Sequence, residues 1–254
     1  MPGRGPKKRG LRSDVSEHLV LLTDLLADGA AEPIENAWLP APLDPARLFP
    51  APAGVELEVG CGKGLFLASA AEAHPDRNFL GIELAPGYAR LTAARCAARG
   101  LANARVISGD ATLTIRSLLG DGCVQAVHVY FPDPWWKARH RKRRVLSEPF
   151  FEQAARVLAP DGTVHVWTDV EEYFHEAMAA AAATGLYRPP RDVAERPAQD
   201  DFDYRTHFER RTRLADQPVW RAELDRTAVR PPQRQPITPY ERVRLQTAGA
   251  DDAT

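Results

Sequence analysis

The chain has 254 residues, of which 44% are hydrophobic, so it is long and apolar enough to bury the core of one large α/β domain. Its formal net charge of −1 predicts no acidic partner, so an argument for a nucleic acid must come from local patches. Cys61, Cys96 and Cys123 form no CxxC pair and no stretch approaches the roughly 20 apolar residues of a membrane span, which predicts a reduced, cytoplasmic protein with no metal and no membrane partner.

The first 53 residues are predicted to precede the main domain. Residues 1–13 hold five basic side chains and no acid, which indicates a basic arm. Between Val15 and Leu26 apolar residues recur at helical spacing, with Asp14 as a candidate N-cap, and this predicts a short amphipathic helix. Six prolines from Pro33 to Pro52 then predict a stiff connector.

From residue 54 onward, short apolar runs alternate with alanine-rich stretches, a pattern typical of parallel strands joined by crossover helices. Strands are expected at 55–59, 79–83, 104–108, 124–131, 163–168 and 219–224. Helices are expected at about 64–74, 87–99, 112–119, 149–158 and 172–184. We therefore expect a domain over residues 54–224, and a poorly ordered tail over 225–254 in which Pro239-Tyr240-Glu241 is a candidate docking segment.

A glycine loop, Glu58-Val-Gly60-Cys-Gly62-Lys-Gly64, follows the first of these strands. Glycines allow a sharp turn and the close approach of a ligand. A dinucleotide site has the spacing GxGxxG and presents a helix N-terminus to phosphate, whereas this loop is GxGxG and has a carboxylate at Glu58. That carboxylate repels phosphate and favours a ligand with an ammonium or sulfonium group, such as S-adenosylmethionine. The alternative is an ordinary tight turn between strand and helix.

Two further acids follow the next two strands. Glu83 ends "NFLGIE" and Asp110 follows "RVISG", so both are expected at the carboxyl edge of the sheet, where open α/β folds bind ligands. Glu83 is placed to accept from ribose hydroxyls and Asp110 from an adenine amino group. Either acid alone is equally explained as a solvated loop carboxylate, but three acids at successive strand ends favour the cofactor site.

In the stretch "FPDPWWKARHRKRR", Asp133 follows the fourth predicted strand, so it is expected at the same carboxyl edge of the sheet. Flanking prolines restrict the backbone on both sides of this residue, which suits a carboxylate that must be aimed. Six lysines and arginines with one histidine occupy the eight residues after Trp136. Such a run binds phosphates, and the two tryptophans offer faces on which a base can stack. A solvated surface or a localisation sequence is the alternative interpretation of the run.

The combination of "EVGCGKG", "GIE", "GDA", "FPDPWWKARHRKRR", "WTD" and "THFERR" resembles the bacterial tRNA (guanine-N7-)-methyltransferases over about residues 55–224. The resemblance implies the class I S-adenosylmethionine-dependent methyltransferase fold, a Rossmann-like, mostly parallel sheet with helices on both faces. It also implies S-adenosylmethionine as cofactor, tRNA as partner, and methylation of N7 of a variable-loop guanosine, position 46 in standard tRNA numbering, which gives 7-methylguanosine.

The resemblance also implies roles for particular residues. Asp133 would be the catalytic acid. The cofactor would be bound by Glu58, Gly60, Gly62, Glu83, Asp110 and Asp133. The substrate would be bound by Lys137, Asp169, Thr206, His207, Phe208 and Glu209. The RNA would be contacted by Arg139, His140, Arg141, Lys142, Arg143 and Arg144.

Other interpretations stay open at this point. A methyltransferase acting on another RNA nucleotide or on protein would show the same cofactor motifs, and so would an RNA-binding module that has lost turnover. Asp169 has an alternative role as the cap of a helix beginning near Glu171, and the segment from Thr206 to Glu209 is alternatively a surface turn. The sequence is compatible with a monomer or a homodimer.

Overall fold

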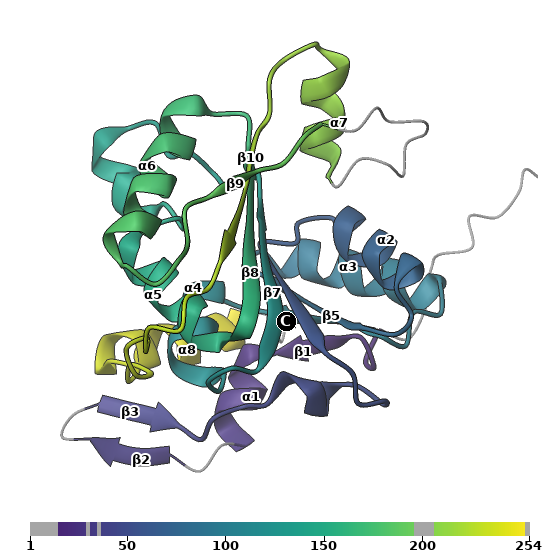
Figure 1. Cartoon of the computed structure of the whole chain (residues 1–254). Coiled ribbons are helices and arrows are strands. Elements are labelled where there is room, and N and C mark those ends of the chain that lie inside the picture. The colour runs from purple at the N-terminus through teal and green to yellow at the C-terminus, as the bar shows by residue number, and fades with distance from the viewer. Residues whose placement is uncertain (1–14, 29–30, 35–36, 196–205, 252–254) are drawn as a thin grey trace, which may run out of the picture.

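The computed structural model describes residues 15–28, 31–34, 37–195 and 206–251, which are built around one eight-stranded sheet (Figure 1). Its strand order is β1-β6-β5-β4-β7-β8-β10-β9, and β10 runs antiparallel to both of its neighbours while the other pairs are parallel. The strands are β1 (Leu19–Leu21), β4 (Val55–Val59), β5 (Asn78–Glu83), β6 (Ala104–Ser108), β7 (Val124–Tyr130), β8 (Leu158–Thr168), β9 (Arg191–Asp192) and β10 (Trp220–Asp225). A separate antiparallel hairpin pairs β2 (Ala31–Ile34) with β3 (Ala37–Pro40).

Helices cover both faces of the sheet, with α2 and α3 on one face and α5 and α6 on the other (Figure 1). The helices are α1 (Leu22–Asp28), α2 (Leu65–Ala73), α3 (Pro86–Ala98), α4 (Ala111–Leu113), α5 (Glu148–Val157), α6 (Glu171–Ala183), α7 (His207–Leu214) and α8 (Pro239–Asp251). Two 3-10 turns, η1 (Pro45–Leu48) and η3 (Ala138–Arg143), and a π-helical turn, η2 (Thr114–Leu118), complete the described elements. Within the part of the chain that the structure describes, no helix is long and apolar enough to span a membrane.

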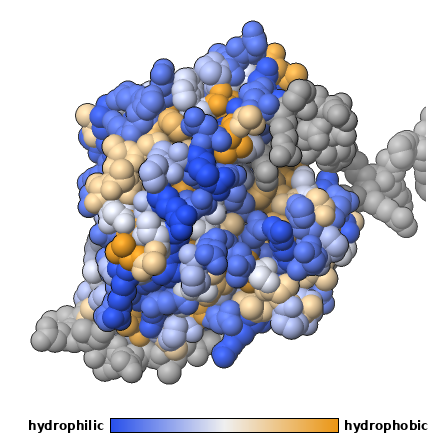
Figure 2. All heavy atoms as spheres, in the orientation of Figure 1, coloured by the Kyte–Doolittle hydropathy of each residue, from blue (hydrophilic) through white to orange (hydrophobic). Residues whose placement is uncertain are grey.

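The central strands are buried on both sides because both faces of the sheet are covered, and their buried side chains are mainly apolar, with Glu56, Glu58 and His128 among the exceptions. Leu57, Val127 and Val166 belong to the core cluster that includes residues of α5 and α6, and Phe66, Phe79 and Ala93 belong to the cluster formed with α2 and α3. On the molecular face drawn in Figure 2, hydrophilic residues predominate and apolar residues occur in small groups, as expected when the large apolar side chains lie inside. The expected Rossmann-like sheet with helices on both faces is therefore confirmed.

The segment before the hairpin differs from its prediction. One helix was expected between residues 15 and 26, but Leu19–Leu21 forms β1 and the helix α1 begins only at Leu22. The outer edge of β6 supplies backbone partners for this short strand, and Val106 N donates to the His18 carbonyl at 2.8 Å. Three residues are too few for an alternating pattern to reveal a strand. The expected Asp14 cap and the basic arm lie outside the described residues.

The proline-rich connector and the tail also contain regular structure. The β2–β3 hairpin and η1 occupy the connector, and Pro33 and Pro40 lie in a two-stranded hairpin, where a missing N–H interrupts no central ladder. Instead of a poorly ordered tail, residues 226–251 return to this hairpin and include α8. Ile237 exchanges backbone hydrogen bonds of 3.0 and 2.7 Å with Trp38 and is 1% exposed. The domain boundaries at 53/54 and 224/225 stay predictions.

Candidate active site

Five of the six acids assigned to the site from the sequence lie along one edge of the sheet. Because β4, β5, β6, β7 and β8 are parallel neighbours, their carboxyl ends meet at a common rim. The acids stand at or just beyond the ends of those strands, at Glu58, Glu83, Asp110, Asp133 and Asp169. Antiparallel β10 begins at the same rim, because its first residue, Trp220, pairs with Thr168 at the end of β8.

The glycine loop after β4 is shaped by backbone contacts with β5. Gly60 N donates to the Ile82 carbonyl at 2.8 Å, and Gly62 N donates to Glu83 Oε2 at 2.8 Å. Gly64 has φ +67°, and a Cβ there would lie 2.2 Å from a methyl carbon of Thr92, so only glycine fits. The loop therefore holds a fixed conformation against the strand end that presents Glu83.

Glu58 is the most unusual acid of the site. It is 4% exposed, and its Oε2 has no hydrogen-bond partner among the described residues. Burial, followed by repulsion from Glu83, raises the pKa of Glu58 to about 8. A buried carboxyl oxygen without a partner, next to a second acid, favours a ligand that brings a positive charge. The ammonium group of S-adenosylmethionine meets this requirement, so the residues present fit that cofactor.

Two further cofactor candidates, Glu83 and Asp110, already make hydrogen bonds with the backbone at the rim. Glu83 is 9% exposed, and its two oxygens accept from Gly62 N at 2.8 Å and from Ala85 N at 2.9 Å. Each oxygen retains a second lone pair, which can accept from a ribose hydroxyl. Asp110 caps α4, because its Oδ1 accepts from Thr112 N at 2.8 Å and from Leu113 N at 3.2 Å.

The turn that holds Asp133 is strained and anchored. Phe131 and Trp135 have φ values of +51° and +45°, which for residues other than glycine cost about 1–3 kcal/mol each. One end is fixed by Phe131 N, which donates to the Trp167 carbonyl at 2.8 Å, and the other by the Pro134 carbonyl, which accepts from Arg144 Nε at 2.7 Å. Asp133 is thus an exposed carboxylate on a turn held at both ends.

The basic run forms η3 and is mostly exposed. Arg143 lies with its guanidinium 5.0 Å from the centre of the Trp135 ring, and the His140 ring meets the same indole edge-on at 5.7 Å. Arg141 pairs with Glu172 at 3.0 Å and Glu176 at 3.3 Å, on α6. The exposed positions, where phosphate can be reached, are Lys137, Arg139, Arg141, Lys142 and Arg143.

Arg144 differs from the other cations of the run. It is 8% exposed, lies 4.8 Å from the centre of the Tyr173 ring, and pairs with Glu176 while it also binds the Pro134 carbonyl. The sequence placed it among the RNA contacts, but the structure turns it inward. Its evident role is to join the Asp133 turn to α6.

The expected substrate residues lie on two segments. Asp169 is exposed after β8, and because the N-cap of α6 is Val170, the alternative role of Asp169 as the helix cap is wrong. Thr206 is the N-cap of α7, with its side chain accepting from Glu209 N at 3.0 Å. Phe208 is 52% exposed, whereas the His207 side chain lies outside the described residues.

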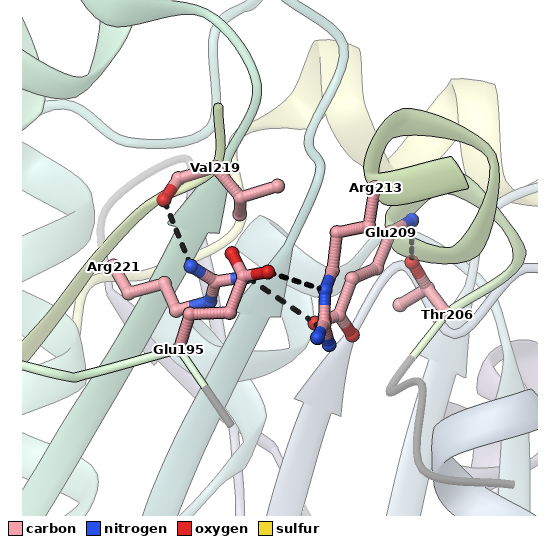
Figure 3. Close-up of polar contacts among 6 residues, drawn as sticks. All are labelled: Glu195, Thr206, Glu209, Arg213, Val219 and Arg221. Carbon is pink, nitrogen blue, oxygen red and sulfur yellow. Dashed lines mark hydrogen bonds and ion pairs between the residues drawn. The ribbon is translucent and has the colours of Figure 1, made fainter. Parts of the chain in front are cut away.

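Glu209 belongs to a buried ionic network that sequence reasoning missed (Figure 3). It is 1% exposed, and its Oε1 lies 3.3 Å from Arg213 and 3.5 Å from Arg221, while Glu195 bridges the same two arginines at 2.9 and 3.0 Å. The Arg221 guanidinium also lies 5.1 Å from the centre of the Trp167 ring. The sequence indications were the i,i+4 spacing of Glu209 and Arg213 and an arginine in the strand WRAELD.

Comparisons with known proteins agree with this geometry. Residues 52–222 match the family described as "Putative methyltransferase". The chain is 44% identical over 189 residues to a tRNA (guanine-N(7)-)-methyltransferase of Rhodopirellula baltica, covering 72% of this chain and 70% of that protein. It is 34% identical over 217 residues to one of Shewanella pealeana, covering 82% and 90%.

Among solved structures, a 16S rRNA (adenine(1408)-N(1))-methyltransferase of Catenulisporales acidiphilia, determined with its cosubstrate SAM, matches with a TM-score of 0.51. That match has 19% identity and covers 80% of this chain and 99% of the other. The 16S rRNA methyltransferase KamB gives the same TM-score at 18% identity, over 68% and 88% of the two chains. At these identities the likeness concerns the fold alone.

Proposed function

Because the chain belongs to the tRNA (guanine-N7-)-methyltransferase family, we propose that it transfers the methyl group of S-adenosylmethionine to N7 of the guanosine at position 46 in the tRNA variable loop. The observation that best supports this proposal is the pairing of β4 with β7. It puts the buried, partnerless carboxyl oxygen of Glu58 and the rigid Asp133 turn at the ends of neighbouring strands. We place the reaction in the cytoplasm, with a monomer or a homodimer as the acting form.

The three strand-end acids would hold the cofactor. Glu58 accepts from its amino group, Glu83 from its ribose hydroxyls, and Asp110 from its adenine amino group. When bound, the cofactor supplies an electrophilic methyl group on a positively charged sulfur. The glycine loop lets the backbone approach this ligand closely, since side chains at Gly60 and Gly62 would stand between them.

The reaction depends more on the position of guanine N7 than on a basic side chain. Guanine N7 already has an in-plane lone pair and no proton, so no general base is required. Positive charge develops on the base as the methyl group arrives, and the carboxylate of Asp133, fixed on its strained turn, stabilises that charge. Because the turn is anchored before the reaction, little reorganisation is needed at the transition state.

Specificity for guanine would come from the exposed polar groups around Asp133. Lys137 donates to O6, and Asp169 accepts from N1–H and the exocyclic amino group, a pattern that adenine cannot satisfy. Glu209 is buried between two arginines, so we assign it to holding α7 instead of to contacting the base. Arg139, Arg141, Lys142 and Arg143 bind tRNA phosphates.

The test is to incubate the purified chain with unmodified tRNA and labelled S-adenosylmethionine and to map the methylated nucleotide. We expect 7-methylguanosine at position 46 and no product with a tRNA that has adenosine there. Asp133→Asn should lower kcat about 10²–10³-fold with little change in tRNA affinity. Asp161→Asn, at an exposed position of β8, is the matched control. Methylation of another nucleotide or of protein would favour the alternative substrates, and unchanged turnover in Asp133→Asn would remove Asp133 from catalysis.

A further inference from the structure

Two phenylalanines from distant parts of the chain face one another at the rim. Phe131 follows β7 and begins the Asp133 turn, and Phe208 lies in the first turn of α7. Their rings are nearly parallel, with an interplanar angle of 18° and centroids 6.4 Å apart. Neither ring is fully buried: Phe208 is 52% exposed and Phe131 is partly exposed.

The separation of the rings is close to the space that one flat base occupies. Carbon atoms in contact lie about 3.5 Å apart, so a base stacked between two rings needs them about 7 Å apart. If the rings lie face to face without offset, the centroid distance of 6.4 Å requires a further opening of only about half an ångström. Directly packed rings also have this centroid distance when they are offset, and a tRNA that lacks the target base distinguishes the two arrangements.

The surroundings of the pair favour a ligand. Phe131 packs against the core cluster formed with α2 and α3, stays partly exposed, and adopts a costly backbone conformation with φ +51°. On α7, the Arg211 guanidinium lies 4.9 Å from the centre of the Phe208 ring and adds a positive charge beside it. Exposed acids stand close by in the chain, Asp133 two residues after Phe131, and Asp169 two residues after Trp167, whose carbonyl binds Phe131 N. An apolar slot with polar groups around it is the usual way to hold an extruded base.

We propose that Phe131 and Phe208 form a slot that holds the target guanine base by stacking on both of its faces. This inference rests on the proposed function and adds the element that positions the base. Stacking fixes the plane of the base but not its identity, so Phe131 and Phe208 set affinity while Lys137 and Asp169 select guanine.

The kinetic test compares Phe131→Leu, Phe208→Leu, the double variant and Phe208→Tyr. Each leucine variant should lower kcat/KM for tRNA about tenfold through a higher KM, because it removes an aromatic face but keeps apolar bulk. Phe208→Tyr should retain activity, and binding of S-adenosylhomocysteine should not change in any variant. Leu214→Ala, 63% exposed at the other end of α7, is the control. Unchanged KM and kcat in both leucine variants would overturn the slot.

A binding test does not depend on turnover. In Phe208→Trp, the fluorescence measured as a difference from the parent chain should be quenched by tRNA and not by the same tRNA with an abasic site at position 46. Equal quenching by both RNAs, or none, would show that the rings pack directly and would overturn the slot. Absence of 7-methylguanosine with the parent chain would instead contradict the proposed function, and the quenching comparison would still decide whether a base enters.

Discussion

The burial of Glu58 lowers the stability of the folded protein when its carboxyl group must ionise without a cationic ligand. Its pKa is raised from 4.5 to about 8 by burial and by Glu83, so the folded protein retains a proton that the unfolded chain releases. Stability attributable to this group is complete below about pH 4.5 and is lost as the pH rises through about 8.

We therefore predict that Glu58→Gln increases the stability of the cofactor-free protein at pH 8, by an amount on the order of a few kcal/mol, and removes this part of its pH dependence. The parent chain should become less stable between pH 5 and pH 8 while the variant changes less. Urea unfolding at both pH values measures the difference. Asp76→Asn, at a carboxylate with 76% side-chain exposure, is the control and should leave the slope unchanged.

A second prediction at the same residue concerns ligand binding. A cationic amino group binds the ionised form of Glu58, so binding must displace the proton that the buried carboxyl holds below about pH 8. The affinity for S-adenosylhomocysteine should rise by up to about tenfold per pH unit between pH 6 and pH 8. Calorimetry in buffers of different ionisation enthalpy would detect the released proton. A pH-independent affinity would contradict the role assigned to Glu58.

At the scale of elements, α7 depends on charge because it has little apolar surface to bury. Its sequence, HFERRTRL, has no apolar stripe, and the helix is capped by Thr206 and fixed to β10 through Glu209, Arg213 and Arg221. This explains why no helix was predicted for residues 207–214. The stabilising partner, Arg221, comes from a strand whose antiparallel arrival at the rim is a property of the whole sheet.

We predict that Arg221→Met destabilises the protein by about 3–5 kcal/mol, because it leaves the buried carboxylate of Glu209 with one arginine fewer. The tRNA KM should also rise, since α7 presents Phe208. Arg191→Met removes an ion pair at a side chain that is 56% exposed and should cost no more than about 1 kcal/mol. Urea unfolding measures the stability of both variants. An equal loss of stability in the two would contradict the stabilising role of the ionic network around Glu209.

Other elements were predictable to different degrees. The predicted ranges of β4 and β6 match the structure because each is a short segment that contains β-branched and other apolar residues and is bounded by turn residues. β1 and the β2–β3 hairpin were missed because short strands are specified by the partner that they meet, not by their own periodicity. The strand-end acids were found because parallel topology places them, whereas the inward turn of Arg144 depends on packing over Tyr173, which a run of cations does not reveal.

At the scale of the whole molecule, the two ends of the described chain stabilise each other. Ile237 is buried and hydrogen-bonded to Trp38, and Arg116 of η2 pairs with Glu241 of α8 at 2.9 Å. Figure 1 shows α8 and the β2–β3 hairpin at the end of the molecule away from α7. The C-terminal segment therefore closes the side of the fold opposite α7.

We predict that Ile237→Ala lowers stability by about 2–5 kcal/mol through the cavity that it leaves, without changing the tRNA KM. Val229→Ala, at a site that is 55% exposed, should have little effect on stability. Thermal melting together with steady-state kinetics tests this. An Ile237→Ala protein as stable as the parent chain would contradict the stabilising role of this segment.

The ion pairs of Arg141 with Glu172 and Glu176 affect which anions the cationic run can bind. The carboxylates of Glu172 and Glu176 neutralise part of the cationic run. A phosphate must therefore compete with both of them for the Arg141 guanidinium. A folded tRNA that engages several cations at once can win that exchange, while a small anion cannot. If the run binds tRNA as proposed, these ion pairs would favour an extended polyanion over small phosphates.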